Sequence, residues 1–369
     1  MEQWILQDIC KIYDCPHTTA KDEGLGMPLV RTPNVGKGRL NLTNVHRVSS
    51  EVYKERTVRA IPEEDDIIIA REAPVGNAAI IQKGQIVCLG QRVVLLKPNK
   101  DLVDPNFLVY YLLSNEVQHR LRIQANGAVV AHLNVADIRN LTISLPPLYE
   151  QKRIGKSLKI IDDKIDLNRR INDNLEQQAQ ALFKSWFVEN ASYSGVSISE
   201  YFLPNRGKNL LVSDAKGGKT PVVAGGLTPS AFHNVANTKA PVITISASGA
   251  NAGFVNLWGI PVWAADSSYI DSTIVSNIYF WYNLLKYNQK NIYESQTGSA
   301  QPHIYPKHIG NLLIPDLDMR KVECYESIVT SMYLQINEIQ QETKFLSDLR
   351  DTLLPKLMSG ELKINDLNC

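Results

Sequence analysis

Two long stretches of the chain carry apolar residues at alternating intervals of three and four. In residues 148–189 these positions are Ile154, Leu158, Ile161, Ile165, Leu175, Ala179, Leu182 and Trp186. In residues 321–358 they are Tyr325, Val329, Met332, Ile336, Ile339, Leu346, Leu353 and Leu357. This spacing predicts two amphipathic helices, each about 60 Å long at the α-helical rise. Pro355 lies where the second helix is expected to kink or end.

An apolar stripe on each of two long helices needs a partner surface, and the simplest partner is the other helix. We therefore expect the two helices to pair as an antiparallel coiled coil. Polar residues interrupt the stripes near their middle, at Asn168 and Asn172 in the first helix and at Thr343 in the second. They predict a polar layer inside the pair, unless the two asparagines face solvent on a curved helix.

The rest of the chain has short β-type runs separated by turn residues, at 66–70, 86–89, 93–96, 242–245, 253–256 and 260–263. Helical pieces are expected near 106–122 and 276–287. Two loops that follow apolar strands, 70–77 and 246–251, are rich in small and polar residues that could approach a ligand closely. The pattern predicts the α+β class, with globular domains at 1–147 and 191–316, long helices at 148–190 and 317–362, and a tail at 363–369.

The chain also contains an internal duplication. Residues 127–143 and 298–314 align without a gap at a constant offset of 171, with identical pairs that include Gly127/Gly298, His132/His303 and Asn140/Asn311. The same offset pairs Tyr111 with Tyr282 and Gln118 with Gln289, and it continues into the two long helices. The protein therefore contains two copies of one unit, and each copy is a globular part followed by a helix.

Composition and cysteine usage place the chain in a broad class. It has 369 residues, of which 44% are hydrophobic, which is enough for two or three packed domains. No apolar run is long enough to span a bilayer, and the N-terminus lacks the pattern of a signal peptide. The five cysteines are odd in number and scattered, which is typical of free thiols. We expect a cytoplasmic protein with no membrane partner.

Charge is distributed unevenly although the net charge is only +1. Residues 31–59 contain seven Lys and Arg side chains against two Glu, so this segment could face phosphates. The alternative is a solvated sheet edge, since charged side chains also prevent unwanted strand pairing.

Motifs with catalytic potential are incomplete. Residues 216–220 end like a phosphate-binding loop, but Ser213 stands where its first glycine is needed. The Glu361 and Lys363 pair has nuclease-like spacing in the wrong context, beyond a helix end. Cys10, Cys15 and His17 lack the spacing of a metal site. We predict a protein without catalytic residues, metal or cofactor of its own.

Three segments resemble the specificity subunit of type I restriction-modification systems. They are LPPLYEQKRI at 145–154, ALFKSWF at 181–187 and LLPKLMSGEL at 353–362. The overall plan agrees with that family, which has two target-recognition domains, each followed by a helix. The resemblance implies a non-catalytic subunit that reads double-stranded DNA. It also implies methyltransferase subunits, which would bring S-adenosylmethionine, and an endonuclease subunit as partners.

Two related domains joined by a helix pair should read two different half-sites separated by an unread gap, with the helices acting as a ruler. Base reading would use Arg, Asn and Gln side chains in the major groove, with Lys on phosphates. The candidates for DNA contact are Arg31, Lys37, Arg39, Arg71, Asn77, Lys219, Ser248, Asn251, Gln296 and Gln301.

For partner docking we single out Trp186 and Phe187, which we expect to be exposed, with their repeat equivalents Leu357 and Met358. The alternative is that these residues pack into the core of a globular domain. Two rival functions remain at this point. The chain could serve a methylation-only or fused modification and cleavage system, or it could be a coiled-coil adaptor that binds only proteins.

Overall fold

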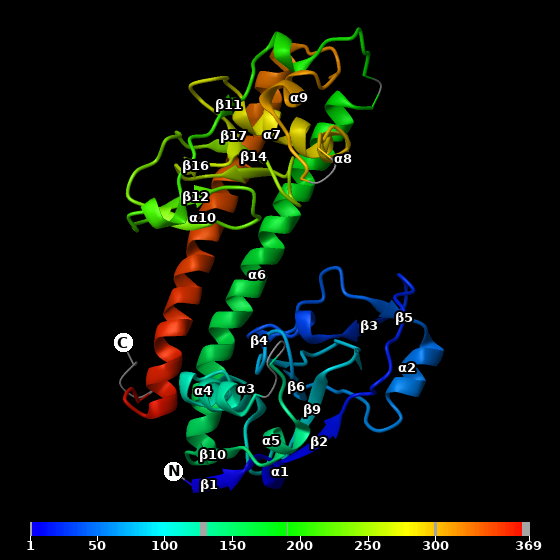
Figure 1. The fold of residues 1–369 in the computed structure, drawn as a ribbon, viewed down its shortest axis with the longest axis vertical. Helices are drawn as coiled ribbons and strands as arrows, with labels where there is room; N and C mark the ends of the chain where they lie inside the picture. Colours follow the sequence, from blue (N-terminus) through cyan, green and yellow to red (C-terminus); the bar gives the residue numbers. More distant parts are fainter. Residues whose placement is uncertain (1, 126–130, 190, 299–300, 364–369) are drawn as a thin grey trace. The chain divides into compact units, whose positions relative to one another are not determined.

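The computed structural model describes residues 2–125, 131–189, 191–298 and 301–363. Gly127 of the repeat, Cys369 and residues 364–369 of the expected tail lie outside them. The chain forms two compact units (Figure 1). Unit 1 comprises residues 1–166 and 344–369, and unit 2 comprises residues 167–343. The domain limits given above stay a prediction, whereas the α+β class with two long helices is confirmed.

Unit 1 contains three small sheets. Their strands are β1 (Glu2–Ile5), β2 (Cys10–Asp14), β3 (Met27–Val30), β4 (Gly38–Arg39), β5 (Arg47–Val48), β6 (Ile67–Ala70), β7 (Ala78–Ile80), β8 (Cys88–Leu89), β9 (Val93–Pro98) and β10 (Thr142–Leu145). The largest sheet has the order β2-β9-β6-β7-β4, the second has the order β5-β3-β8, and β1 pairs with β10. In the largest sheet β6 is antiparallel to β9, with Ile67 opposite Leu96.

The central strand β6 explains why an unbroken apolar run forms a strand here. Ile67 and Ile69 belong to a core cluster that also includes residues of the helices of unit 1. Ile68 and Ala70 belong to a second cluster on the other face of the sheet. Successive side chains of a strand point to opposite faces, so a strand covered on both faces must be apolar throughout. The helices of unit 1 are α1 (Leu6–Ile9), η1 (Thr32–Asn34), α2 (Ser50–Arg56), α3 (Pro105–Leu112), α4 (Asn115–Gln124) and α5 (Val135–Arg139).

Unit 2 repeats this plan with fewer strands. They are β11 (Asn205–Arg206), β12 (Thr220–Val223), β13 (Ala231–His233), β14 (Val242–Ser246), β15 (Val255–Trp258), β16 (Trp263–Ala264) and β17 (Ser267–Asp271). They form sheets of order β11-β17-β14-β15 and β13-β12-β16. The shorter helices are η2 (Ile198–Glu200), η3 (Val212–Asp214), α7 (Ile278–Tyr287), α8 (Gln289–Glu294) and α9 (Pro306–Gly310).

The long helices are α6 (Leu148–Phe187) and α10 (Met319–Ser359), and each passes through both units. In unit 1, Arg350 Nη1 lies 2.8 Å from Asp162 Oδ1. In unit 2, Tyr325 donates to the carbonyl of Ala179 at 2.9 Å. Residue numbers fall along α10 as they rise along α6, so the segments are antiparallel within each unit (Figure 1). Supercoiling stays a prediction. Helix α10 continues through Pro355 for one more turn, rather than ending there.

The expected exposure of Phe187 is wrong. Only 5% of it is exposed, and its ring centroid lies 4.9 Å from that of Phe280 in a T-shaped contact. Leu357 is likewise buried, in the core of unit 1, while Trp186 and Met358 are partly buried. Ring faces and edges attract each other and bury a large apolar area, so packing into the core wins over exposure.

The duplication extends to backbone contacts. Helices α5 and α9 begin and end at positions that differ by 171, 306 − 135 and 310 − 139. The amide of Leu6 donates to the carbonyl of Leu141, and the amide of Ile198 donates to the carbonyl of Leu312, 171 positions further on. The two copies therefore fold alike around the repeat, although unit 2 has an isolated bridge between Ser197 and Leu313 in place of a full β1–β10 ladder.

The two copies cap equivalent helices in different ways. In unit 1, Asp104 caps α3 by accepting from the amide of Phe107, and a Cβ on Gly155 of α6 would lie 2.6 Å from both groups. Position 326, at 155 + 171, is a glutamate whose carboxylate accepts the amides of Tyr279 and Phe280 at 3.1 and 2.7 Å. Helix α7 has no side-chain bond from its own N-cap residue, so Glu326 of α10 supplies the acceptor.

Two further features concern the whole chain. Cys10, Cys15 and Cys88 are free and buried, while Cys324 is free and exposed. Among the described helices, none combines the length and the apolar character needed to cross a membrane.

The polar layer gives a first prediction. Asn168 is fully buried, and its Nδ2 donates to Glu342 at 2.8 Å while its Oδ1 has no hydrogen-bond partner. A buried carbonyl without a partner costs about 1–3 kcal/mol, which exceeds the net value of one hydrogen bond. Asn168→Leu should therefore raise the midpoint of thermal unfolding, measured by circular dichroism. A lower midpoint would show that the bond to Glu342 outweighs the unsatisfied oxygen.

The cap on α7 gives a pH-dependent prediction. Burial raises the pKa of Glu326, an effect that the amides of Phe280 and Tyr279 only partly offset. The folded protein thus holds this proton more tightly than the unfolded chain. The resulting stability is fully present below the ordinary glutamate pKa of 4.5 and is lost as the pH rises through the raised value.

Glu326→Gln removes this titration. The free energy of unfolding of the variant, minus that of the wild type, should therefore increase as the pH rises from about 4.5. Urea titrations across this pH range measure the difference. A difference that stays constant with pH would mean that the carboxyl group titrates equally in the folded and unfolded states.

Candidate nucleic-acid interface

Each unit contains a β-hairpin whose backbone hydrogen bonds at the base, here called its frame, are the same in both copies. The hairpin of unit 1 joins β6 to β7, and that of unit 2 joins β14 to β15. At the base of the first, the amide of Ala70 donates to Asn77 and the amide of Gly76 donates to Ala70. At the base of the second, Ser246 donates to Phe254 and Gly253 donates to Ser246 in the same arrangement. We call residues 71–76 and 247–253 the hairpin tips.

The repeat block supports both tips at the same place. The amide of Leu133 donates to the carbonyl of Arg71 at 2.9 Å, and the amide of Ile304 donates to the carbonyl of Ala247 at 2.9 Å. Since 304 − 133 is again 171, the contacts are equivalent. His132 and His303 form the neighbouring isolated bridges, with Glu72 and Ser248 respectively. The backbone of each of these two histidines therefore pairs with a tip residue and helps to support the tip.

A groove of about 610 Å³ borders the tip of unit 1. Pro74, Val75 and Asn77 contribute from the hairpin, and Gln118 and Arg122 from α4. Lys37 and Arg350 also line it, with Asp351 as the acidic member. Lys37 and Arg122 are exposed, so the groove presents positive charge beside the tip. Such a concave and cationic surface suits a phosphate backbone.

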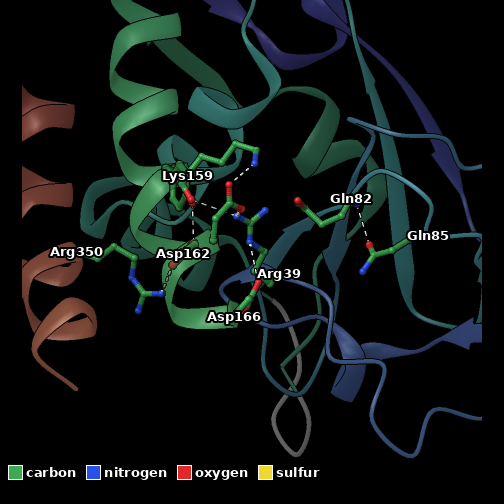
Figure 2. A network of polar contacts seen from close by, with 9 residues as sticks. Arg39, Gln82, Gln85, Lys159, Asp162, Asp166 and Arg350 are labelled. Carbon is green, nitrogen blue, oxygen red and sulfur yellow. Dashed lines mark hydrogen bonds and ion pairs between the residues drawn. The ribbon is translucent and has the colours of Figure 1, made fainter. Parts of the chain in front are cut away.

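Lys37 and Arg39 have different environments although only Gly38 separates them. Arg39 is 12% exposed, and its Nη2 lies 2.6 Å from Asp163 Oδ1 while its Nε lies 3.4 Å from Asp166 (Figure 2). Gly38 has φ +90°, and a Cβ there would lie 3.0 Å from Asp162 Oδ2. The glycine therefore lets β4 approach α6 closely, with Arg39 bound to the helix and Lys37 at the groove.

Figure 2 also shows Arg350 reaching Asp162 from α10. The carboxylate of Asp162 is 3% exposed and additionally accepts the hydroxyl of Tyr110 at 2.6 Å. Burial, followed by the charge of Asp162, raises the pKa of Tyr110. The phenol therefore stays a donor at neutral pH. This cluster connects α3, α6 and α10 inside unit 1 and orients Arg350 at the groove wall.

The other residues of unit 1 that were predicted to contact DNA lie either at the hairpin tip or in a second groove. Arg71 is the first residue of the tip and Asn77 follows its last residue. Both are engaged in the fold: Arg71 Nε donates to the carbonyl of Leu133 at 2.7 Å, and Asn77 Nδ2 donates to the carbonyl of Val35 at 2.9 Å. Arg31 lines a separate groove of about 270 Å³ with Lys21, Asp22 and His46. Its Nε is buried without a hydrogen-bond partner.

In unit 2, three of the predicted residues meet at the tip. The hydroxyl of Ser248 donates to Asp266, and Asn251 Nδ2 donates to the carbonyl of Gly225 at 3.3 Å. Gln296 Nε2 donates to the carbonyl of Ala252 at 2.7 Å. Lys219 is exposed in the turn before β12, and Gln301 is exposed after α8, so neither belongs to this set of contacts. Their roles in DNA contact stay predictions.

Sequence reasoning missed Gln118, Arg122, Arg350 and Gln289. A signal for Gln118 and Gln289 existed, since they are identical across the repeat. Arg122 and Arg350 carried no such mark, because the groove brings together segments more than two hundred positions apart.

Comparison with known proteins gives consistent results. Residues 1–177 match the family described as type I restriction modification DNA specificity domain. The chain is 32% identical over 162 residues to the putative type I restriction enzyme MjaX specificity subunit of Methanocaldococcus jannaschii, a match that covers 44% of this chain and 35% of that protein. It is 23% identical to the type I restriction enzyme MjaIX specificity subunit of the same organism, over 90% of this chain and 84% of the relative.

The fold agrees with these matches. The crystal structure of a type I restriction-modification system S subunit from M. genitalium superposes with a TM-score of 0.59 at 20% identity, and the match covers 96% of this chain and 95% of that one. The family match over the first copy, the relatives and this shared fold point the same way. Residues 1–177 thus match the type I restriction modification DNA specificity domain, and the chain as a whole is similar to type I restriction-modification specificity subunits.

Proposed function

We propose that this chain is the sequence-specific DNA-recognition subunit of a type I restriction-modification complex and that it reads a bipartite, asymmetric target. The observation that carries this is the pair of hairpins with one frame and different tips. The sequence of the first tip is REAPVG and that of the second is ASGANAG. They share the final glycine, Gly76 or Gly253, whose amide donates to the last residue of the preceding strand. Two similar supports with different contact residues are suited to reading two different half-sites.

Polar groups that can discriminate bases lie within or directly beside both tips. Asn77 closes the first hairpin, and Asn251 lies within the second. Amide side chains recognise adenine, and hydroxyl groups such as that of Ser248 bind several bases. In the first unit the cationic groove would hold the phosphates beside the bases that the tip reads. Helices α6 and α10 would set the gap between the half-sites.

The chemistry would come from partner subunits. Methyltransferase subunits would bring S-adenosylmethionine, and an endonuclease subunit would cut the DNA, while this chain supplies recognition. Because Phe187 and Leu357 are buried, docking would use other side chains of the long helices. Exposed apolar residues are available there, including Ile160 and Phe345 in unit 1 and Leu334 in unit 2.

The direct test is to co-express the chain with its methyltransferase partner in a host that lacks DNA methylation, and to map the modified adenines. The proposal expects a motif of two different half-sites with a fixed gap. A continuous motif would contradict the bipartite reading. A well-formed complex that modifies nothing and has no salt-sensitive, sequence-dependent affinity for DNA would favour the protein-binding adaptor. Cleavage by the same partner would identify a fused system.

The groove of unit 1 makes a separate prediction. Lys37→Ala and Arg122→Ala should each weaken binding to all DNA sequences alike, because phosphate contacts carry no base information. Each should also reduce the slope of log affinity against log salt by about 1. Lys83→Ala, at an exposed position outside the groove, is the matched control. If Lys83→Ala has the same effect as the groove variants, the groove holds no phosphate.

A further inference from the structure

The two hairpin tips share a side-chain contact that the backbone frame does not require. Gln118 of α4 donates through Nε2 to the carbonyl of Gly76 at 2.8 Å. Gln289 of α8 donates through Nε2 to the carbonyl of Gly253 at 2.7 Å. The glutamines are identical across the repeat, since 289 − 118 is 171. The same atom of the same side chain therefore holds the same carbonyl in both copies.

The receiving glycine is equally specific. Gly76 and Gly253 have φ of +84° and +87°, a backbone conformation that other residues rarely adopt. A Cβ on Gly76 would lie 3.2 Å from Gln118 Oε1 and 3.3 Å from Leu121, while one on Gly253 would lie 3.0 Å from Ile292. Leu121 and Ile292 also differ by 171 and are both 1% exposed. One helix turn thus supplies both the glutamine amide that donates to the glycine carbonyl and the apolar side chain that packs against the glycine.

Each glutamine is fixed by a second hydrogen bond. Gln118 Nε2 also donates to the carbonyl of Leu112 at the end of α3, at 2.8 Å. Gln289 Oε1 accepts from the amide of Val255, the first residue of β15, at 2.9 Å. A side-chain amide that is held by two hydrogen bonds can transmit the position of the helix to the hairpin. The tip is then supported on one side by the repeat block and on the other by the glutamine.

We propose that Gln118 and Gln289 are positioning residues for base reading, each of which sets the orientation of its own hairpin tip against one half of the DNA target. This rests on the proposed function. The support is preserved while the tips differ, so the glutamine fixes where the tip lies and the tip residues decide what it reads. Recognition requires contact groups to be held within a fraction of an ångström, and an unsupported tip would lose discrimination before it lost affinity.

Gln118→Glu and Gln289→Glu test this directly. The replacement has nearly the same shape, but its carboxylate cannot donate to the glycine carbonyl. Gln124→Glu, exposed on α4, and Lys290→Gln, exposed on α8, change the charge by the same amount without touching a tip. Full-length chain in complex with its methyltransferase partner is titrated with the mapped target and with targets that carry one wrong base pair in either half.

The expected result is a local loss of discrimination. Gln118→Glu should reduce the preference for the correct base by about tenfold in one half-site only, and Gln289→Glu should do so in the other half-site only. Each variant thereby serves as a control for the other, and the two surface variants should resemble the wild type. Equal loss in both half-sites, or no loss in either, would overturn the proposal.

Amide hydrogen exchange supplies an independent readout. Gln118→Glu should speed exchange in residues 71–76, and Gln289→Glu should do so in residues 247–253, while the core strands β6 and β14 stay protected. Unchanged exchange at the tips would also overturn the positioning role. If the wild-type complex shows no bipartite preference, the proposed function fails, and the exchange data still decide whether the glutamines hold the tips.

Discussion

The fold depends on burying the apolar stripes of two long helices. Helices of about 40 residues are not stable in water with such a stripe exposed, so each must be covered along its length. In unit 1 the covering core contains Leu158 of α6 and Leu357 of α10. In unit 2 it contains Phe183 of α6 and Tyr325 of α10. The largest core cluster of each unit therefore includes residues of both long helices, while a second cluster of unit 1, on the other face of β6, forms without them.

This dependence constrains where the sequence can vary. Elements that support the tips, such as α5 and α9 in the repeat block and the glutamines beneath the tips, keep their place and often their identity in both copies. The tips differ in length and sequence, although Ala247 and Ala252 of the second tip are buried. Where a packing residue does change, a compensating change accompanies it: Gly155 accompanies the Asp104 cap in one copy, and Glu326 replaces that cap in the other.

The sequence allowed some features to be predicted because they depend on local periodicity. The three-four spacing identified both helices, and the constant offset of 171 identified the repeat that carries α5 and α9. Interactions between distant segments could not be predicted in this way. Arg39 was expected at DNA but is bound by Asp163, 124 positions away. Phe187 was expected on the surface because its partner Phe280 belongs to another part of the chain.

We propose that the two long helices set the gap between the two half-sites, and this is tested by lengthening both helices. One heptad is inserted after Asp166 of α6 and another after Thr343 of α10, positions that match because Asn168 contacts Glu342. We expect unchanged half-sites and a gap in the modified motif that is longer by about 3 base pairs, since a heptad extends a helix by about 10 Å. An unchanged gap, with both half-sites still read, would contradict it.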